Sequence, residues 1–324
     1  MKVVIIGSGA FGTALGSALS KNRNLEVFLI SRNLSQVEQI NKKNKNTAYL
    51  DGKKLSKRLT ATSDLNTISG SDFAMLALPS NVVGQFVEKN RNNFQNVGCI
   101  VNLSKGFGTD NGILIPDTIL RIMGVDFPVA SIKGPTFAHD LLSSPTSAFS
   151  LASTHSEKAK LLKKVFKGAN IKTDYGNSIH ELEYLSILKN VYAIAMGVIE
   201  AKYSNPNLRA AIFTDSLRET RVIASFFLGQ KVDVLKYAGI GDILLTGLND
   251  QSRNRTLGLM IGKTFLNPTS TNNGVVVEGV RSIRLIKDKL PENVMSKLKI
   301  FSALVDLMEL KINAAEFLKK IIKN

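Results

Sequence analysis

Cysteine and tryptophan are nearly absent from this chain. Its 324 residues include one cysteine, Cys99, and no tryptophan. A single cysteine excludes an internal disulfide framework, the usual support of small secreted domains. The N-terminus lacks the layout of a signal peptide, because the apolar run Val3–Ile6 is short and glycines follow it. These absences favour a cytoplasmic protein.

Histidine and long apolar runs are also scarce. The three histidines, His139, His155 and His180, show no metal-ligand spacing, so we predict no metal. We find no apolar run that is long enough to span a bilayer, and we therefore expect no integral membrane segment.

Acidic residues are outnumbered by basic ones. There are 42 Lys and Arg against 26 Asp and Glu, a net charge of +16. Such a charge suits nucleic acid, an anionic membrane or an anionic small ligand. No run combines basic residues with regularly placed aromatics, so a basic solvated surface is favoured and no nucleic-acid partner is predicted. A nucleotide-binding regulator or RNA-associated protein remains the alternative from another class.

The most informative glycines lie near the N-terminus. The apolar run Val3–Ile6 ends in Gly7-x-Gly9-x-x-Gly12, and a helical pattern follows directly. This order of strand, glycine turn and helix is typical of a dinucleotide site, whereas a glycine-rich turn alone is weak. Gly7 allows the tight turn, Gly9 the approach of a pyrophosphate, and Gly12 close helix packing.

Short apolar strands alternate with amphipathic helices in the first half. This alternation predicts an α/β fold with a Rossmann-type doubly wound, mostly parallel sheet over residues 1–180. The predicted strands are Lys2–Ile6, Glu26–Ile30, Phe73–Leu78, Cys99–Leu103, Val129–Ile132, Ala148–Leu151 and Ile171–Thr173.

Long helical periodicities dominate the second half. They predict a mainly α-helical C-terminal domain over residues 181–324. The predicted helices are Ile179–Ala201, Leu208–Leu228, Arg253–Thr264, Val275–Lys287 and Glu292–Leu307.

The cofactor is indicated by the end of the second predicted strand. Many NAD sites hold the ribose 2′-hydroxyl with a carboxylate about 20 residues beyond the glycines, and none stands there. Arg32, with Ser31, could instead accept a 2′-phosphate, although Arg32 could equally be an ordinary exposed arginine. The sequence therefore leans towards NADP over NAD.

Four further segments carry groups that suit catalysis. Lys105 and the segment Gly134-Pro135-Thr136 each follow a predicted strand, where ligands bind in doubly wound sheets. Lys189 lies in an apolar helical stretch, and Asp242 follows two glycines. Each alone also fits a structural role, such as an exposed turn lysine, a helix cap or a snorkelling lysine.

The triplet Ser252-Arg253-Asn254 begins a predicted helix. Polar and cationic groups at a helix start suit a phosphate. Arg253 could alternatively pair with Asp242 across the loop.

Taken together, these segments resemble the NAD(P)-dependent sn-glycerol-3-phosphate dehydrogenases of the bacterial type over nearly the whole chain. Each segment alone is weak evidence for this family, but the order in which they occur together is specific to it. They are Gly7-x-Gly9-x-x-Gly12, Ser104-Lys105-Gly106, Gly134-Pro135-Thr136-Phe137-Ala138, Lys189-Asn190, Asn207–Ala211, Gly239–Asp242, Ser252–Arg255 and Val276–Gly279.

The resemblance implies reversible reduction of dihydroxyacetone phosphate to sn-glycerol 3-phosphate by a homodimer, supplying glycerophospholipid synthesis. Lys189 would donate the proton in reduction, within a network of Lys105, Asp242 and Thr246. The implied substrate contacts are Lys105, Gly134, Thr136, Lys189, Asp242, Ser252, Arg253 and Asn254. The implied cofactor contacts are Gly7, Gly9, Ala10, Phe11, Gly12, Arg32, Lys105, Ala138, Arg253, Val276 and Glu278.

The chain departs from this family at one visible place. Thr214-Asp215-Ser216-Leu217 stands where the family usually reads Thr-Arg-Gly-Leu, so local packing or a subunit contact is expected to differ. The nearest alternatives are related two-domain dehydrogenases, such as a ketopantoate reductase or a 6-phosphogluconate or hydroxyacid dehydrogenase. Those are not expected to carry Gly239–Asp242 and Ser252–Arg255 in this order.

Overall fold

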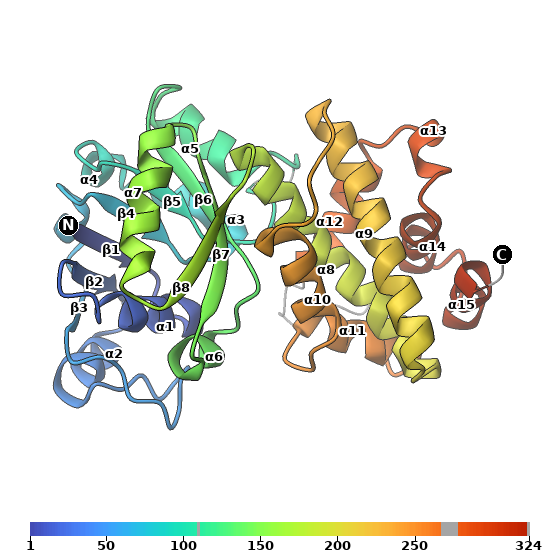
Figure 1. Ribbon diagram of the computed structural model, residues 1–324, viewed down its shortest axis with the longest axis horizontal. Helices are drawn as coiled ribbons and strands as arrows, with labels where there is room; N and C mark the ends of the chain where they lie inside the picture. The colour runs from blue at the N-terminus through green and yellow to red at the C-terminus, as the bar shows by residue number, and fades with distance from the viewer. Residues whose placement is uncertain (109–110, 267–277, 323–324) are drawn as a thin grey trace. The chain divides into compact units, whose positions relative to one another are not determined.

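The chain folds into two compact units. The computed structural model describes residues 1–108, 111–266 and 278–322. The first unit covers the chain to Leu182, and the second runs from Glu183, together with Asn111 and Gly112. Figure 1 shows the strands gathered in the first unit, and the described part of the second unit is built from helices.

The first unit is built on an eight-stranded sheet. Its order is β3-β2-β1-β4-β5-β6-β7-β8, and each neighbouring pair is parallel except β6 and β7, which are antiparallel. The predicted doubly wound, mostly parallel sheet is therefore confirmed. The strands are β1 (Lys2–Ile6), β2 (Glu26–Ile30), β3 (Leu59–Thr62), β4 (Phe73–Leu76), β5 (Ile100–Asn102), β6 (Val129–Lys133), β7 (Ser147–Ser153) and β8 (Ile171–Tyr175).

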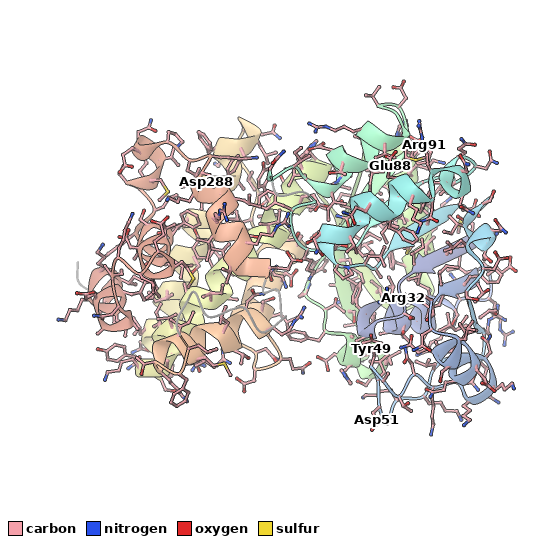
Figure 2. All side chains as sticks on the ribbon, turned by 180° about the vertical axis from the view of Figure 1, so that it is seen from behind. Arg32, Tyr49, Asp51, Glu88, Arg91 and Asp288 are labelled. Atoms are coloured by element: carbon pink, nitrogen blue, oxygen red, sulfur yellow. The ribbon has the colours of Figure 1, made fainter. Side chains whose placement is uncertain are left out.

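Helices cover both faces of this sheet. Val3 and Ile5 of β1 belong to a core cluster with residues of α1 and α7, which cross in front of the sheet in Figure 1. Helix α3, which carries Glu88, lies over the opposite face in Figure 2. Burial on both faces explains why the inner strands read as continuous apolar runs. The helices are α1 (Ala10–Leu19), α2 (Leu34–Glu38), α3 (Ser80–Lys89), α4 (Arg91–Phe94), α5 (Ile115–Met123), α6 (Ala138–Ser143) and α7 (Ser156–Lys167).

Helix α8 (Ile179–Lys202) is the longest helix of the described chain and leads into the second unit. By length and composition it could cross a membrane, which the sequence analysis did not anticipate, and its apolar window is completely buried inside the structure. A helix that is apolar on all sides is typical of a buried core position as well as of a membrane span.

The remaining helices of the described chain belong to the second unit. Four expectations need correction: β3, α10 and α15 were not predicted, and the single helix predicted over Glu292–Leu307 is two helices. These elements are α9 (Pro206–Leu228), α10 (Asp242–Gly247), α11 (Arg253–Gly262), α12 (Glu278–Lys287), α13 (Glu292–Met295), α14 (Lys299–Met308) and α15 (Ala314–Ile322).

A buried carboxylate joins three of these helices. Glu219 of α9 accepts hydrogen bonds from the backbone N–H groups of Ile300 (2.7 Å) and Phe301 (2.9 Å) at the start of α14. The hydroxyl of Tyr192, on α8, donates to the same carboxylate at 3.0 Å. Burial raises the pKa of Glu219 to about 7, and the three donors oppose this rise. Glu219 therefore satisfies N–H groups that the helix itself leaves unpaired.

We predict that Glu219 makes stability depend on pH. The folded-state pKa lies above the ordinary value of 4.5, so the stabilising contribution is full below pH 4.5 and is lost as the pH rises through 7. The free energy of unfolding should fall by at most about 3 kcal/mol across this window. Denaturant unfolding at a series of pH values measures it.

Glu219→Gln should remove this decline, because glutamine does not titrate. It should also cost about 1–3 kcal/mol at acidic pH, since one backbone N–H loses its acceptor. Glu157→Gln, on the exposed side of α7, is the matched control and should retain the wild-type pH dependence. An unchanged pH dependence in Glu219→Gln would contradict the prediction.

Candidate functional site

The glycine turn after β1 forms a cradle that only glycine permits. Gly7 has a φ of +114°, and a Cβ there would lie 2.4 Å from the carbonyl oxygen of Ala77. A Cβ on Gly12 would lie 2.0 Å from the carbonyl oxygen of Gly7. In front of Gly9, by contrast, a Cβ would meet nothing within 4 Å. Gly9 is the N-cap of α1 and provides no side-chain cap, so the turn fits a pyrophosphate held by backbone N–H groups.

Predicted cofactor contacts cluster around this turn. Ala10, Phe11 and Ala138 are partly buried and pack against the core of the first unit. The ring of Phe11 meets that of Phe149 edge-on, with centroids 6.3 Å apart. The packing of α1 against α6 thus brings Ala138 to the same apolar wall as Ala10 and Phe11.

Arg32 lies exposed just after β2, at the surface seen in Figure 2. Within the described residues its guanidinium has no hydrogen-bond or ion-pair partner. The neighbouring Ser31 is buried, and its hydroxyl contacts Ser8 (2.7 Å) and Gln36 (3.0 Å). Arg32 is therefore open to an anionic group, whereas Ser31 supports the glycine turn.

The turns after β5 and β6 meet through Lys105. Its Nζ donates to the carbonyl oxygen of Gly134 at 3.0 Å, so the structure brings these two predicted substrate residues together. The hydroxyl of Thr136 is buried, and among the described residues it has no hydrogen-bond partner. A buried hydroxyl without a partner is a ready contact for a polar ligand.

The second unit holds a buried ammonium and carboxylate. Lys189 Nζ lies 3.2 Å from Asp242 Oδ1 and donates to Thr246 Oγ1 at 2.9 Å. The hydroxyl of Thr246 lies 3.3 Å from the same Asp242 oxygen. Asp242 is 1% exposed and Lys189 8%, so the ion pair is shielded from water. Lys189 is thus held inward, whereas snorkelling would place its ammonium in solvent.

The start of α11 presents one unpaired guanidinium on a firmly held turn. Ser252 is the N-cap of α11 and accepts from the N–H of Arg255 at 3.3 Å. The amide of Asn254 donates to Asn190 at 2.9 Å and accepts from Gly279 at 3.0 Å. Arg253 is exposed, and among the described residues its side chain makes no hydrogen bond or ion pair. Arg253 is therefore placed to receive an anion.

Three residues to which the sequence analysis gave no role, Arg255, Glu200 and Asp250, also hold this turn. Arg255 contacts Glu200 of α8 at 2.7 Å and Asp250 before the helix. Helices α8 and α11 approach closely, since a Cβ on Gly258 would lie 2.1 Å from the carbonyl oxygen of Ile194. Arg255 stands in the same Ser-Arg-Asn-Arg motif, but nothing local distinguishes its buried role from the exposed one of Arg253.

Two predicted cofactor residues remain. Glu278 begins α12, directly before Gly279, whose N–H contacts Asn254. Val276 lies outside the described residues. Among those residues, no group of three or more His, Cys, Asp or Glu side chains is placed to hold a metal ion.

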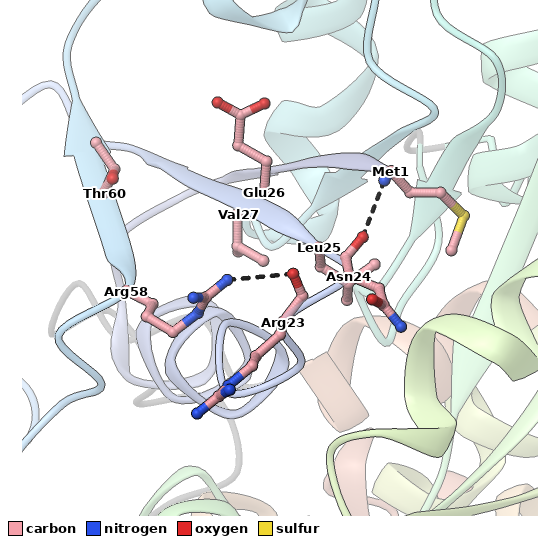
Figure 3. Close-up of a pocket in the computed structure, with 8 residues that line it drawn as sticks. All are labelled: Met1, Arg23, Asn24, Leu25, Glu26, Val27, Arg58 and Thr60. Carbon is pink, nitrogen blue, oxygen red and sulfur yellow. Dashed lines mark hydrogen bonds between the residues drawn. The ribbon is translucent and has the colours of Figure 1, made fainter.

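A separate depression lies at the opposite, amino-terminal edge of the sheet. It has a volume of about 460 Å³ and is lined by residues around Met1, Arg23 and Arg58. Arg58 donates to the backbone carbonyl of Arg23 at 3.3 Å, the contact drawn in Figure 3. Its Nε also donates to the backbone carbonyl of Ser20 at 3.0 Å. These contacts satisfy carbonyl groups near the end of α1, so Arg58 has a structural role there.

Two family models match the chain. The N-terminal domain of NAD-dependent glycerol-3-phosphate dehydrogenase matches residues 2–159, and its C-terminal domain matches residues 179–319.

Individual relatives are similar in sequence to this chain along most of their length. The glycerol-3-phosphate dehydrogenase [NAD(P)+] of Methanothermobacter thermautotrophicus is 33% identical over 89% of this chain and 88% of its own. The glycerol-3-phosphate dehydrogenase [NAD(P)+] of Malacoplasma penetrans is 30% identical over 99% of this chain and 96% of its own length. The crystal structure of glycerol-3-phosphate dehydrogenase from Coxiella burnetii has the same fold, with a TM-score of 0.82 and 22% identity over 100% of this chain and 99% of that one.

Proposed function

Because this chain belongs to the NAD-dependent glycerol-3-phosphate dehydrogenase family, we propose that it reduces dihydroxyacetone phosphate to sn-glycerol 3-phosphate, reversibly, with NAD(P)H. The observation that carries the chemistry is the buried ammonium of Lys189, held by Asp242 and Thr246. A carbonyl that accepts a hydride needs a proton and a positive charge at its oxygen, and this group supplies both.

The bound nicotinamide cofactor supplies the hydride. In our proposal Lys189 donates a proton to the developing alkoxide in reduction and accepts it in oxidation. Asp242 and Thr246 hold the ammonium in one orientation, which lowers the entropic cost of the transfer. Lys105 and the hydroxyl of Thr136 orient the carbonyl of the ketone.

We propose that Arg253 binds the substrate phosphate. Its guanidinium suits two phosphate oxygens, and those N–H groups at the start of α11 that Ser252 does not cap add a second attraction. Ser252 already accepts from the N–H of Arg255, and Asn254 accepts from the N–H of Gly279, so their main contribution is to fix the turn. Binding at the phosphate is remote from the reacting carbon and positions it.

One assay tests the proposed function. Dihydroxyacetone phosphate is supplied with NADH and with NADPH in parallel, and oxidation of the cofactor is followed. Ketopantoate and 6-phosphogluconate (the latter with oxidised cofactor) serve as alternative substrates. We expect turnover of dihydroxyacetone phosphate; no turnover with either cofactor would reject the proposal. Strongly salt-dependent RNA binding without turnover would instead favour a nucleic-acid role.

We propose that NADP is preferred over NAD because Arg32 is exposed and unpaired within the described chain, where a 2′-phosphate would lie. Arg32→Ala should raise KM for NADPH about tenfold, because one charge-assisted contact is lost, and should change KM for NADH little. Steady-state kinetics with both cofactors measure this. Arg23→Ala, an exposed arginine at the other edge of the sheet, is the control. Equal changes of both KM values would contradict the preference.

We also propose that the enzyme is a cytoplasmic homodimer that supplies glycerophospholipid synthesis. Support comes from the family resemblance and from the single buried cysteine, which suits a reducing compartment. Light scattering of the purified protein tests the oligomeric state. A monomeric mass at assay concentration would reject the dimer.

A further inference from the structure

Lys133 is a fully buried lysine at the end of β6, beside two residues of the proposed site. Complete burial of lysine is uncommon, because an ammonium loses its hydration and must be compensated by partners. An aliphatic residue would end a buried strand without that cost. The charge at this position therefore indicates a specific role.

Lys133 and Lys105 each donate a hydrogen bond to the backbone next to the other lysine. The ammonium of Lys133 donates to the carbonyl oxygen of Ser104, the residue directly before Lys105. In the opposite sense, Lys105 Nζ donates to the carbonyl oxygen of Gly134, the residue directly after Lys133, at 3.0 Å. We call these two crossed contacts the lysine clasp. The clasp ties together the turns that follow β5 and β6.

Both turns in the clasp are anchored at their bases. The N–H of Ser104 donates to Asn102 Oδ1 at 2.9 Å, and its hydroxyl donates to the carbonyl oxygen of Leu78 at 2.5 Å. A Cβ on Gly134 would lie 2.5 Å from the carbonyl oxygen of Ala148, so its backbone packs tightly against β7. With the Ser104 carbonyl fixed, the Lys105 side chain starts from a defined point.

We propose that Lys133 is a positioning residue for the reduction, which keeps the Lys105 ammonium beside Gly134 by holding the carbonyl of Ser104. The inference rests on the proposed function, in which Lys105 orients the substrate carbonyl. Lys133 acts through Lys105 and does not need to touch the substrate. A displacement of Lys105 by about 1 Å is enough to lower the rate up to about 100-fold.

The test replaces the ammonium while keeping the buried volume. Lys133→Met should lower kcat/KM for dihydroxyacetone phosphate by about 10-fold to 100-fold. The dissociation constant of NADPH, measured by fluorescence, should change far less, because Lys105 is one of eleven implied cofactor contacts. Lys172→Met, an exposed lysine on β8 of the same sheet, is the matched control and should behave as wild type.

A double-mutant cycle separates positioning from general support of the fold. In the Lys105→Met background, adding Lys133→Met should cause little further loss, because its effect passes through Lys105. The same fold loss in both backgrounds would overturn the proposal, as would an unchanged kcat/KM in Lys133→Met.

A second variant keeps the proposal testable if Lys133→Met does not fold. Lys133→Gln keeps an N–H donor for the Ser104 carbonyl, and we expect it to recover part of the activity lost in Lys133→Met. If neither variant folds, Lys133 serves stability and the proposal is overturned. Turnover of dihydroxyacetone phosphate by the wild-type enzyme is measured alongside. Its absence would reject the proposed function itself, independently of the clasp.

Discussion

Replacing Lys189 by alanine should lower kcat for dihydroxyacetone phosphate by about 10²–10⁴-fold, with a much smaller change of KM. The reason is that the ammonium acts mainly on the alkoxide that forms in the transition state, whereas substrate binding is assigned to Arg253. A loss of kcat and kcat/KM together is the kinetic signature of an interaction made only in the transition state. Near-normal turnover would end the assignment.

Two further variants exclude indirect explanations. Removal of Lys189 leaves the buried Asp242 carboxylate without its charge partner, which can itself disturb the site. The double variant Lys189→Met with Asp242→Asn restores charge balance and volume, and it should remain inactive if the ammonium is the proton donor. Lys231→Ala, an exposed lysine of the same unit, should retain wild-type kcat.

Replacing Arg253 by alanine should raise KM for dihydroxyacetone phosphate about 100-fold, because a charged, two-pronged contact to the phosphate is lost. The effect should be largest on KM, since the phosphate is bound in both the ground state and the transition state. Because the turn is already held by Ser252, Asn254 and Arg255, loss of the exposed guanidinium should not disturb the fold.

The phosphate assignment has a direct internal check. Inorganic phosphate should inhibit the wild-type enzyme competitively with substrate and should inhibit Arg253→Ala more weakly. Slow reduction of unphosphorylated dihydroxyacetone should be the same in both proteins. Arg218→Ala removes an exposed arginine of α9 that pairs with Asp215 at 2.9 Å, and it is the control. An unchanged KM in Arg253→Ala would contradict the phosphate role.

Local pattern was sufficient for most of the fold but failed at particular elements. The glycine turn and the inner strands are predictable because full burial produces continuous apolar runs. Strand β3 was missed because it alternates between buried and exposed residues over four positions at the edge of the sheet. The predicted helix over Glu292–Leu307 is interrupted because the N–H groups at the start of α14 bind Glu219, which is 81 residues from Ile300.

Only the structure shows where Asp215 and Ser216, which stand in place of the family's usual Arg-Gly, are located. Asp215 pairs with Arg218 on the surface of α9, whereas Ser216 is completely buried. Within the described residues the hydroxyl of Ser216 has no hydrogen-bond partner. The family's glycine at this position would leave no hydroxyl to satisfy, and the structure offers no reason for the serine.

The sequence by itself determined the dinucleotide turn, the two-part organisation and the order of motifs that identifies the family. These depend on residues close together in the chain, whose conformations follow from local sterics and periodicity. Only the tertiary structure decided which polar side chains are available to the substrate and which hold the surrounding backbone in place. It buries Lys189 against Asp242, leaves Arg253 open beside an anchored Asn254, and crosses Lys133 with Lys105. Such pairings join distant segments, and their geometry is set by how strands and helices pack, which no local pattern encodes.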